Sequence, residues 1–122
     1  MAVNKISQVL LEPGIIRIQV EPDSFLDVDD ILAMRKVNLE LSGGERFSVL
    51  LDTTAGYFGN SPEAIRMLAS EEYLLSRKAT AIVVKSLAAR LAGNFFKKLN
   101  TPKCPTRLFT SEEDAIKWLR KF

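Results

Sequence analysis

The chain has 122 residues, of which 47% are hydrophobic and 26% charged, and its net charge is +2. This size and composition are typical of one globular domain that buries its core without disulfides or metals, so we expect a single domain over residues 1–122. The absence of histidine and the presence of only one cysteine exclude Ser-His-Asp and Cys-His catalytic groups, histidine-bearing metal sites and thiolate clusters.

Two further absences bear on class and location. No apolar run approaches the roughly 20 residues of a membrane-spanning helix, and the N-terminal residues lack the pattern of a signal peptide. Cys104 cannot form a disulfide within the chain, so a reducing cytoplasm is the expected location. Because neither a P-loop nor a dinucleotide-binding glycine motif is present, we expect a non-enzymatic protein with no catalytic residue, no cofactor and no metal.

The N-terminal part predicts a hairpin, a helix and a central strand. Pro13-Gly14 separates two apolar runs, which predicts strands at about 5–12 and 14–20. Asp27 is placed to cap a helix that runs to about Leu41 and ends at two glycines. The next run, 46–52, is almost continuously apolar, as in a strand that is covered on both faces.

The first predicted helix carries two apolar stripes. The stripe expected to face the core consists of Ile31, Met34, Val37 and Leu41. A second stripe on roughly the opposite side consists of Val28, Leu32 and Leu39. Either this helix is buried over a wide face, or the second stripe meets another protomer or a partner protein.

The second half of the chain continues the alternation of helices and strands. Ser61 and Pro62 are typical of the cap and the first position of a helix. The expected elements are a helix from Pro62 with a short continuation from Ser70 to Ser76, a strand at 78–84, a helix from Ser86 to Leu99, a strand at 106–109, and a last helix opened by a capping box at 110–113. The order β-β-α-β-α-β-α-β-α predicts an α/β sandwich, with a mixed sheet of about five strands covered by about four helices.

This order, together with two motifs, resembles the STAS domain of anti-sigma factor antagonists (the SpoIIAA-like domains). Val49-Leu-Leu-Asp52-Thr53-Thr54 is similar to the family strand that reads roughly VLDLS. The family motif MDSSG, which starts the next helix, falls on Phe58-Gly-Asn60-Ser61-Pro62, so that Pro62 occupies the position that a partner kinase normally phosphorylates. The segments 79–96 and 108–119 are also similar to small bacterial STAS-like proteins.

The resemblance implies a regulatory interaction module that binds a kinase-like or other signalling protein through the 53–62 loop and the following helix. It does not carry the phosphorylated serine over to this chain. The candidate phosphoacceptor or recognition residues are Ser61, Thr53, Thr54, Asp52 and Asn60. Each also has a plain structural interpretation, as a helix cap for Ser61 and as turn residues for the others.

Two other sets of residues are candidates for binding. Lys85 and Ser86 follow the strand at 78–84, where a lysine and a helix cap could together hold an anion. Phe96, beside two lysines, could contact a second protomer or a membrane surface, and a homodimer could form either through Phe96 or through the stripe Val28, Leu32 and Leu39. A nucleic-acid partner is not expected, because Phe95 falls on the inner face of its helix and leaves only one aromatic side chain outside.

Two hypotheses of function therefore remain. In the first, the protein is a cytoplasmic regulatory module that binds another protein. In the alternative, it is a homodimer that binds or senses a small ligand, either a nucleotide or an apolar molecule.

Overall fold

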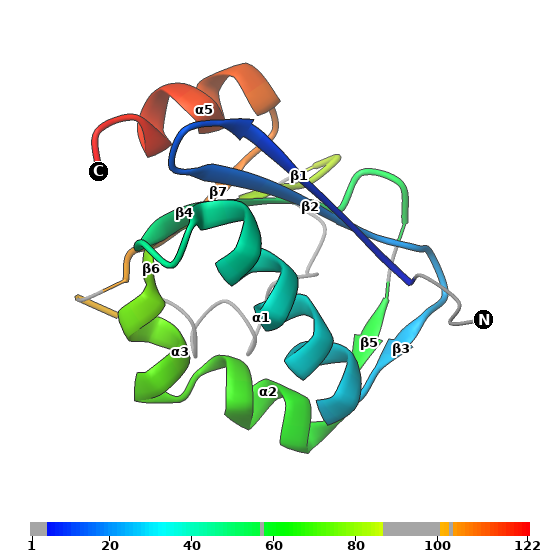
Figure 1. Cartoon of the computed structure of the whole chain (residues 1–122). Helices are drawn as coiled ribbons and strands as arrows, with labels where there is room; N and C mark the ends of the chain where they lie inside the picture. Colours follow the sequence, from blue (N-terminus) through cyan, green and yellow to red (C-terminus); the bar gives the residue numbers. More distant parts are fainter. Residues whose placement is uncertain (1–4, 57, 87–100, 103) are drawn as a thin grey trace.

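A mixed five-stranded sheet forms the centre of the protein, as the computed structural model shows for residues 5–56, 58–86, 101–102 and 104–122 (Figure 1). Its strand order is β1-β2-β4-β6-β7. The strands are β1 (Ile6–Glu12), β2 (Ile15–Val20), β4 (Phe47–Asp52), β6 (Arg77–Val83) and β7 (Thr106–Phe109). Only β1 is antiparallel to its neighbour; the other strand pairs of this sheet are parallel. The predicted α/β class and mixed sheet are confirmed.

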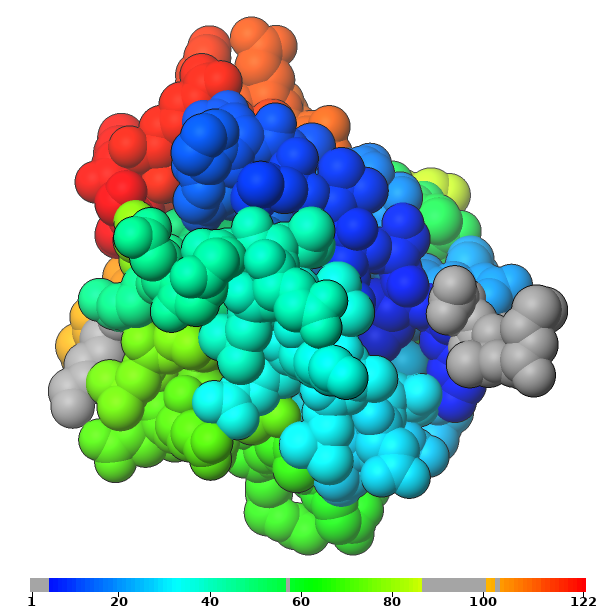
Figure 2. Space-filling model, viewed as in Figure 1, coloured from blue at the N-terminus to red at the C-terminus, as the bar shows by residue number. Residues whose placement is uncertain are grey.

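Helices cover both faces of this sheet (Figure 1). One face packs against α1 (Val28–Ser42), α2 (Pro62–Leu68) and α3 (Glu71–Ser76), and the other packs against α5 (Glu112–Leu119). On the α5 face, Leu50 and the alanines of β6 contact Ala115 and Leu119. Figure 2 shows α1 running across the molecule between the β1–β2 hairpin and the shorter helices α2 and α3.

The helix starts follow the predicted capping chemistry, with one shift of register. Asp27 and Asp30 form a capping box at the start of α1, and Gly43 ends that helix in the left-handed conformation at φ 67°. The last helix is capped by Ser111, whose hydroxyl accepts from the backbone N–H of Asp114 at 3.3 Å. The cap of α5 is therefore Ser111 and not Thr110, one residue later than the capping box expected at 110–113.

A small second sheet lies where the sequence predicted only a turn. The strand β3 (Phe25–Leu26) pairs in parallel with β5 (Gly59–Asn60). The backbone N–H of Ser61 extends this pairing by donating to the carbonyl of Leu26 at 2.8 Å. Strands of two residues are too short to show an alternating pattern, and the pairing attaches the start of α2 to the start of α1.

The inner face of α1 differs from the predicted stripe. Val37 is 37% exposed, whereas Asn38 is only 4% exposed. Asn38 follows Ile31 by seven residues, which is close to two helical turns, so the two side chains share a face. Gln8 of β1 donates to Asn38 Oδ1 at 2.6 Å, and this hydrogen bond allows an amide to occupy the inner position.

Candidate functional site

The candidate residues at the end of β4 form a closed hydrogen-bond cluster around Asp52. The backbone N–H and the hydroxyl of Thr54 donate to Asp52 Oδ1 at 2.9 and 2.6 Å. Arg17 Nη2 and Gln19 Nε2 donate to Asp52 Oδ2 at 2.7 and 3.0 Å. Burial raises the pKa of Asp52, but the hydrogen bonds from Thr54 and Gln19 and the charge of Arg17 outweigh it and hold the pKa below its usual value.

Thr53 is buried next to this cluster and also has its hydroxyl engaged. Thr53 Oγ1 donates to the carbonyl of Val83 at 2.8 Å, and its backbone N–H donates to the same oxygen at 2.9 Å. Asp52, Thr53 and Thr54 thus stabilise the carboxyl edge of the sheet. A role for them in recognition or phosphorylation stays a prediction.

Ser61 is the helix cap that the sequence predicted. Its Oγ accepts from the backbone N–H of Ala64 at 3.0 Å, Pro62 begins α2, and the residue is only 9% exposed. Asn60 precedes it in β5, and its buried Oδ1 has no hydrogen-bond partner among the described residues. The two neighbours therefore differ. The Ser61 hydroxyl caps the helix, whereas Asn60 Oδ1 is a hydrogen-bond acceptor without a partner among the described residues.

Lys85 and Ser86 are exposed at the end of β6. The helix predicted from Ser86 to Leu99, and with it Phe96, lies outside the described residues. The anion-binding role of Lys85 and Ser86 and the contact role of Phe96 stay predictions.

The second stripe of α1 is only partly on the outside. Leu32 is exposed and Val28 is half-buried, as the stripe requires. Leu39, however, packs against the core cluster that contains Ile16 and Val49. The expected continuous outer stripe is therefore wrong at Leu39, because that side chain is partly buried against the sheet. An interface role remains a prediction for Val28 and Leu32.

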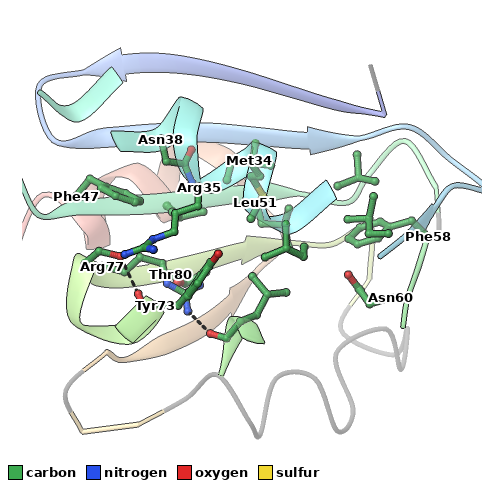
Figure 3. A pocket seen from close by; sticks show the side chains of 17 residues that line it. Met34, Arg35, Asn38, Phe47, Leu51, Phe58, Asn60, Tyr73, Arg77 and Thr80 are labelled. Carbon is green, nitrogen blue, oxygen red and sulfur yellow. Dashed lines mark hydrogen bonds between the residues drawn. The ribbon is translucent and has the colours of Figure 1, made fainter. Parts of the chain in front are cut away.

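A cavity of about 60 Å³ lies between the sheet and the helices α1, α2 and α3 (Figure 3). Most of its wall is apolar. The apolar side chains come from the main sheet, from the small β3–β5 sheet and from α1. The apolar lining includes Val20, Leu26, Ile31, Met34, Leu51 and Phe58. Pockets of this kind, apolar with a few convergent polar groups, are typical of small-molecule sites.

The polar groups of the cavity gather mainly at one end. Figure 3 shows Arg35, Tyr73, Arg77 and Thr80 together, with Phe58 and Asn60 at the opposite end. Four buried atoms of the first group, Arg35 Nε, the Tyr73 hydroxyl, Arg77 Nε and Thr80 Oγ1, have no hydrogen-bond partner of good geometry in the described chain. Because buried polar atoms normally have partners, water or a bound molecule is expected to contact this end of the cavity.

Arg77 is the most unusual member of this group. It is 8% exposed, and Nη2 donates to the carbonyl of Leu68 at 2.9 Å. Burial lowers the pKa of this guanidinium below its ordinary value. Burial also raises the pKa of the Tyr73 hydroxyl, against the opposing charge of Arg35, whose guanidinium lies 4.8 Å from the centre of the Tyr73 ring.

Sequence reasoning missed this group, since its members come from α1, α3 and β6. One signal was present: Arg77 directly precedes the apolar run 78–84, and the strand begins at Arg77 itself. A charged residue inside a strand that is otherwise buried is a reason to look for a partner.

Neither a metal site nor a membrane span is found in the part of the chain that the structure describes. Its cysteine and carboxylate side chains form no group of three or more that could bind a metal ion. The described helices are also too short or too polar to cross a lipid bilayer.

The comparisons with known proteins bear on the fold. A family model described as "Domain of unknown function (DUF7793)" matches residues 9–122. The crystal structure of an uncharacterised protein of the DUF3478 family from Shewanella loihica PV-4, described as having a SpoIIAA-like fold, is similar with a TM-score of 0.68. The two are 18% identical, and the match covers 98% of each chain. No curated protein matches the chain significantly. The predicted STAS-like (SpoIIAA-like) fold is confirmed, and at this identity the likeness concerns the fold alone.

Proposed function

Since the chain belongs to the DUF7793 family and has a SpoIIAA-like fold, we propose that it is a non-enzymatic binding module whose ligand is a small molecule held in the cavity beneath α1. The observation that carries this proposal is the set of buried, unpartnered polar atoms at one end of an otherwise apolar cavity. Leaving each such atom without a partner costs about 1–3 kcal/mol. A fold that retains several of them together gains most when a ligand supplies the missing hydrogen bonds.

The position of the cavity also supports a sensing role. Its wall includes α1 and α3, and its far end is formed by Phe58 and Asn60, which lead directly into the cap of α2. A ligand that contacts these residues would change the stability of the 58–62 segment. Ligand binding would therefore alter the surface on which the family resemblance places the partner. We further propose a cytoplasmic location, and a homodimer through Val28 and Leu32 on α1.

The test is a thermal-shift and NMR titration of the purified protein with a panel of small acids, alcohols, amides and nucleotides. Thr80→Leu places a larger apolar side chain in the cavity, while Thr80→Val keeps its size and removes only the hydroxyl. We expect at least one compound to raise Tm and to shift the amide signals of Tyr73 and Thr80, and we expect Thr80→Leu to abolish both effects. A panel without any hit, or a hit that Thr80→Leu leaves unchanged, would contradict the proposal.

A second candidate function is binding of a protein partner through the 53–62 loop and α2. A specific observation favours it: Phe25, which pairs with Gly59 in the small sheet, is 58% exposed. A large exposed aromatic ring beside the start of α2 is typical of an anchor at a protein interface. It lies on the surface that the family resemblance selects.

This candidate is tested by isolating a partner and then measuring its affinity by calorimetry. Phe25→Ser should weaken binding at least tenfold, and Ser61→Asp should change it measurably. Leu75→Ser is the matched control, because Leu75 is exposed to a similar degree but lies on α3. If Leu75→Ser has the larger effect, the interface is elsewhere.

A further inference from the structure

Arg77 is a buried cation that forms no ion pair with a carboxylate of the described residues. The ion pairs found in the described part of the chain involve Lys5, Arg17, Arg35, Arg66, Lys117 and Arg120, each with a carboxylate, and none involves Arg77. Within the described residues its side chain donates from Nη2 to the carbonyl of Leu68, and Cys104 is a neighbouring titratable group. A buried charge is strongly disfavoured unless it is paired, so the cavity lacks a negative charge at this end.

The neighbouring free atoms have one chemical property in common, which is that all can donate. Nε of Arg35 and Nε of Arg77 are donors that cannot accept, and the hydroxyls of Tyr73 and Thr80 can turn their protons toward a ligand. They converge from α1, α3 and β6 (Figure 3). A group that satisfies several donors at once, and also supplies a negative charge, is an anion whose oxygens only accept, such as a carboxylate.

The rest of the cavity limits the ligand in size and polarity. Away from the arginines the wall consists of side chains such as Met34, Leu51 and Phe58, which suit a hydrocarbon and not a second charge. A volume of about 60 Å³ is several times the minimum that one water molecule needs, which suits a ligand of a few heavy atoms. A phosphate ion would leave the apolar end uncovered and bring additional charge into it. A long acyl chain would exceed the space.

We propose that the cavity binds a short-chain monocarboxylate, with its carboxylate against Arg77, Arg35, Tyr73 and Thr80 and its hydrocarbon toward Leu51 and Phe58. This inference rests on the proposed small-ligand function and specifies the chemical class of the ligand. Arg77 supplies the positive charge that the ligand neutralises. Arg35 is positioned by its ion pair with Glu72, with Nη1 and Oε1 2.8 Å apart, and by its contact with the ring of Tyr73, and it binds the other side of the ligand's carboxylate.

The experiment is an NMR titration of the whole chain with butyrate, and in parallel with butyramide, butylammonium and inorganic phosphate. Butyramide has the shape of butyrate without its charge. We expect butyrate to bind at least tenfold more tightly than butyramide or phosphate, and butylammonium to show no saturable shift. The shifts should be centred on the amides of Tyr73, Arg77 and Thr80.

Three variants separate charge from structure. Arg77→Met should weaken butyrate binding at least tenfold while leaving butyramide binding within twofold, and Arg77→Lys should retain part of the preference for butyrate. Arg66→Met, which removes an exposed arginine of α2, is the control and should change neither. Circular dichroism verifies that each variant is folded.

The possible failures are distinguishable. Equal binding of butyrate and butyramide, or a preference for phosphate, would overturn the monocarboxylate and leave the small-ligand function standing. Unchanged butyrate binding by Arg77→Met would overturn the role of Arg77. Absence of binding by all four compounds would overturn the inference, and the small-ligand function would fall with it only if the wider panel described above also gave no hit.

Discussion

Arg17 of β2 and Asp52 of β4 form an ion pair, with Nη2 and Oδ2 2.7 Å apart, on the sheet face that α5 covers. Nε of the same guanidinium lies 2.7 Å from Glu112 in the first turn of α5. One arginine thus links two adjacent strands and the C-terminal helix. Because Asp52 is buried and Glu112 is 43% exposed, the two carboxylates are expected to contribute unequally.

Asp52→Asn tests that inequality through its pH dependence. We expect the variant to lose about 2 kcal/mol of unfolding free energy at pH 7, since hydrogen bonds to a charged group are lost. The pKa of Asp52 is lowered by folding, so its contribution is present above the unfolded pKa of about 3.9. It is lost as the pH falls through the lower folded pKa. The difference between the wild type and the variant should therefore be constant from pH 5 to 8, by urea titration, and shrink below about pH 4.

Glu112→Gln is the control for this measurement. An exposed ion pair contributes about 0–1 kcal/mol, so the variant should stay within that range at pH 7. If Glu112→Gln costs more than Asp52→Asn, the buried pair is not the stronger link.

Ser61→Ala removes the hydrogen bond from the Ala64 N–H to the serine hydroxyl. Loss of such a cap costs about 1 kcal/mol, and chemical denaturation should detect it. Ser61→Gly should cost only a few tenths of a kcal/mol, because glycine is itself tolerated at the cap. Equal losses in the two variants would mean that the hydroxyl does not stabilise α2.

Gly56→Ala should destabilise the protein more than Gly14→Ala. Both glycines have positive φ, 153° and 87°, so both alanines are strained. Only at Gly56 would the added Cβ meet another residue, at 3.0 Å from Pro22 Cβ, whereas nothing lies within 4 Å at Gly14. We expect an additional loss of at least about 1 kcal/mol at Gly56 from this contact. Similar unfolding midpoints for the two variants would show that Pro22 moves aside freely.

Arg77→Met should raise the unfolding free energy of the ligand-free protein by about 1 kcal/mol, because an unpaired buried charge is replaced by an apolar side chain of similar length. Arg17→Met provides the contrast: it leaves Asp52 buried without its cation, and should lower stability by about 2 kcal/mol. Urea titrations without added carboxylate compare the two. A large loss in Arg77→Met would mean that its bond to Leu68 outweighs the cost of burying the charge.

Local patterns predicted the elements well where one residue type determines the structure. Asp27 and Ser61 are helix caps at the expected positions, and the apolar run ending at Asp52 is the predicted central strand. The inner face of α1 was predicted less well, because Asn38 owes its burial to Gln8, thirty residues earlier in the chain. No periodicity within the helix reveals a partner on another strand.

The candidate site was the least predictable part. The sequence directed attention to 53–62, where most polar side chains proved to be engaged in hydrogen bonds of the fold. The free donors belong to Arg35 of α1, to Tyr73 of α3, and to Arg77 and Thr80 of β6. Each alone is an ordinary residue of a helix or a strand, and only the packing of α1 and α3 on the sheet brings them together.

The main sheet places its strands in the order in which they occur along the chain. No strand has to be inserted between two that are already paired. During synthesis from the N-terminus, the β1–β2 hairpin can form first, and β4, β6 and β7 can each add to the same growing edge. Open edges of sheets readily pair with other chains, and a nascent chain exposes them longest. The outer edge of β1 stays open throughout, but at each stage the other edge of the growing sheet is the one that the next strand to leave the ribosome will cover.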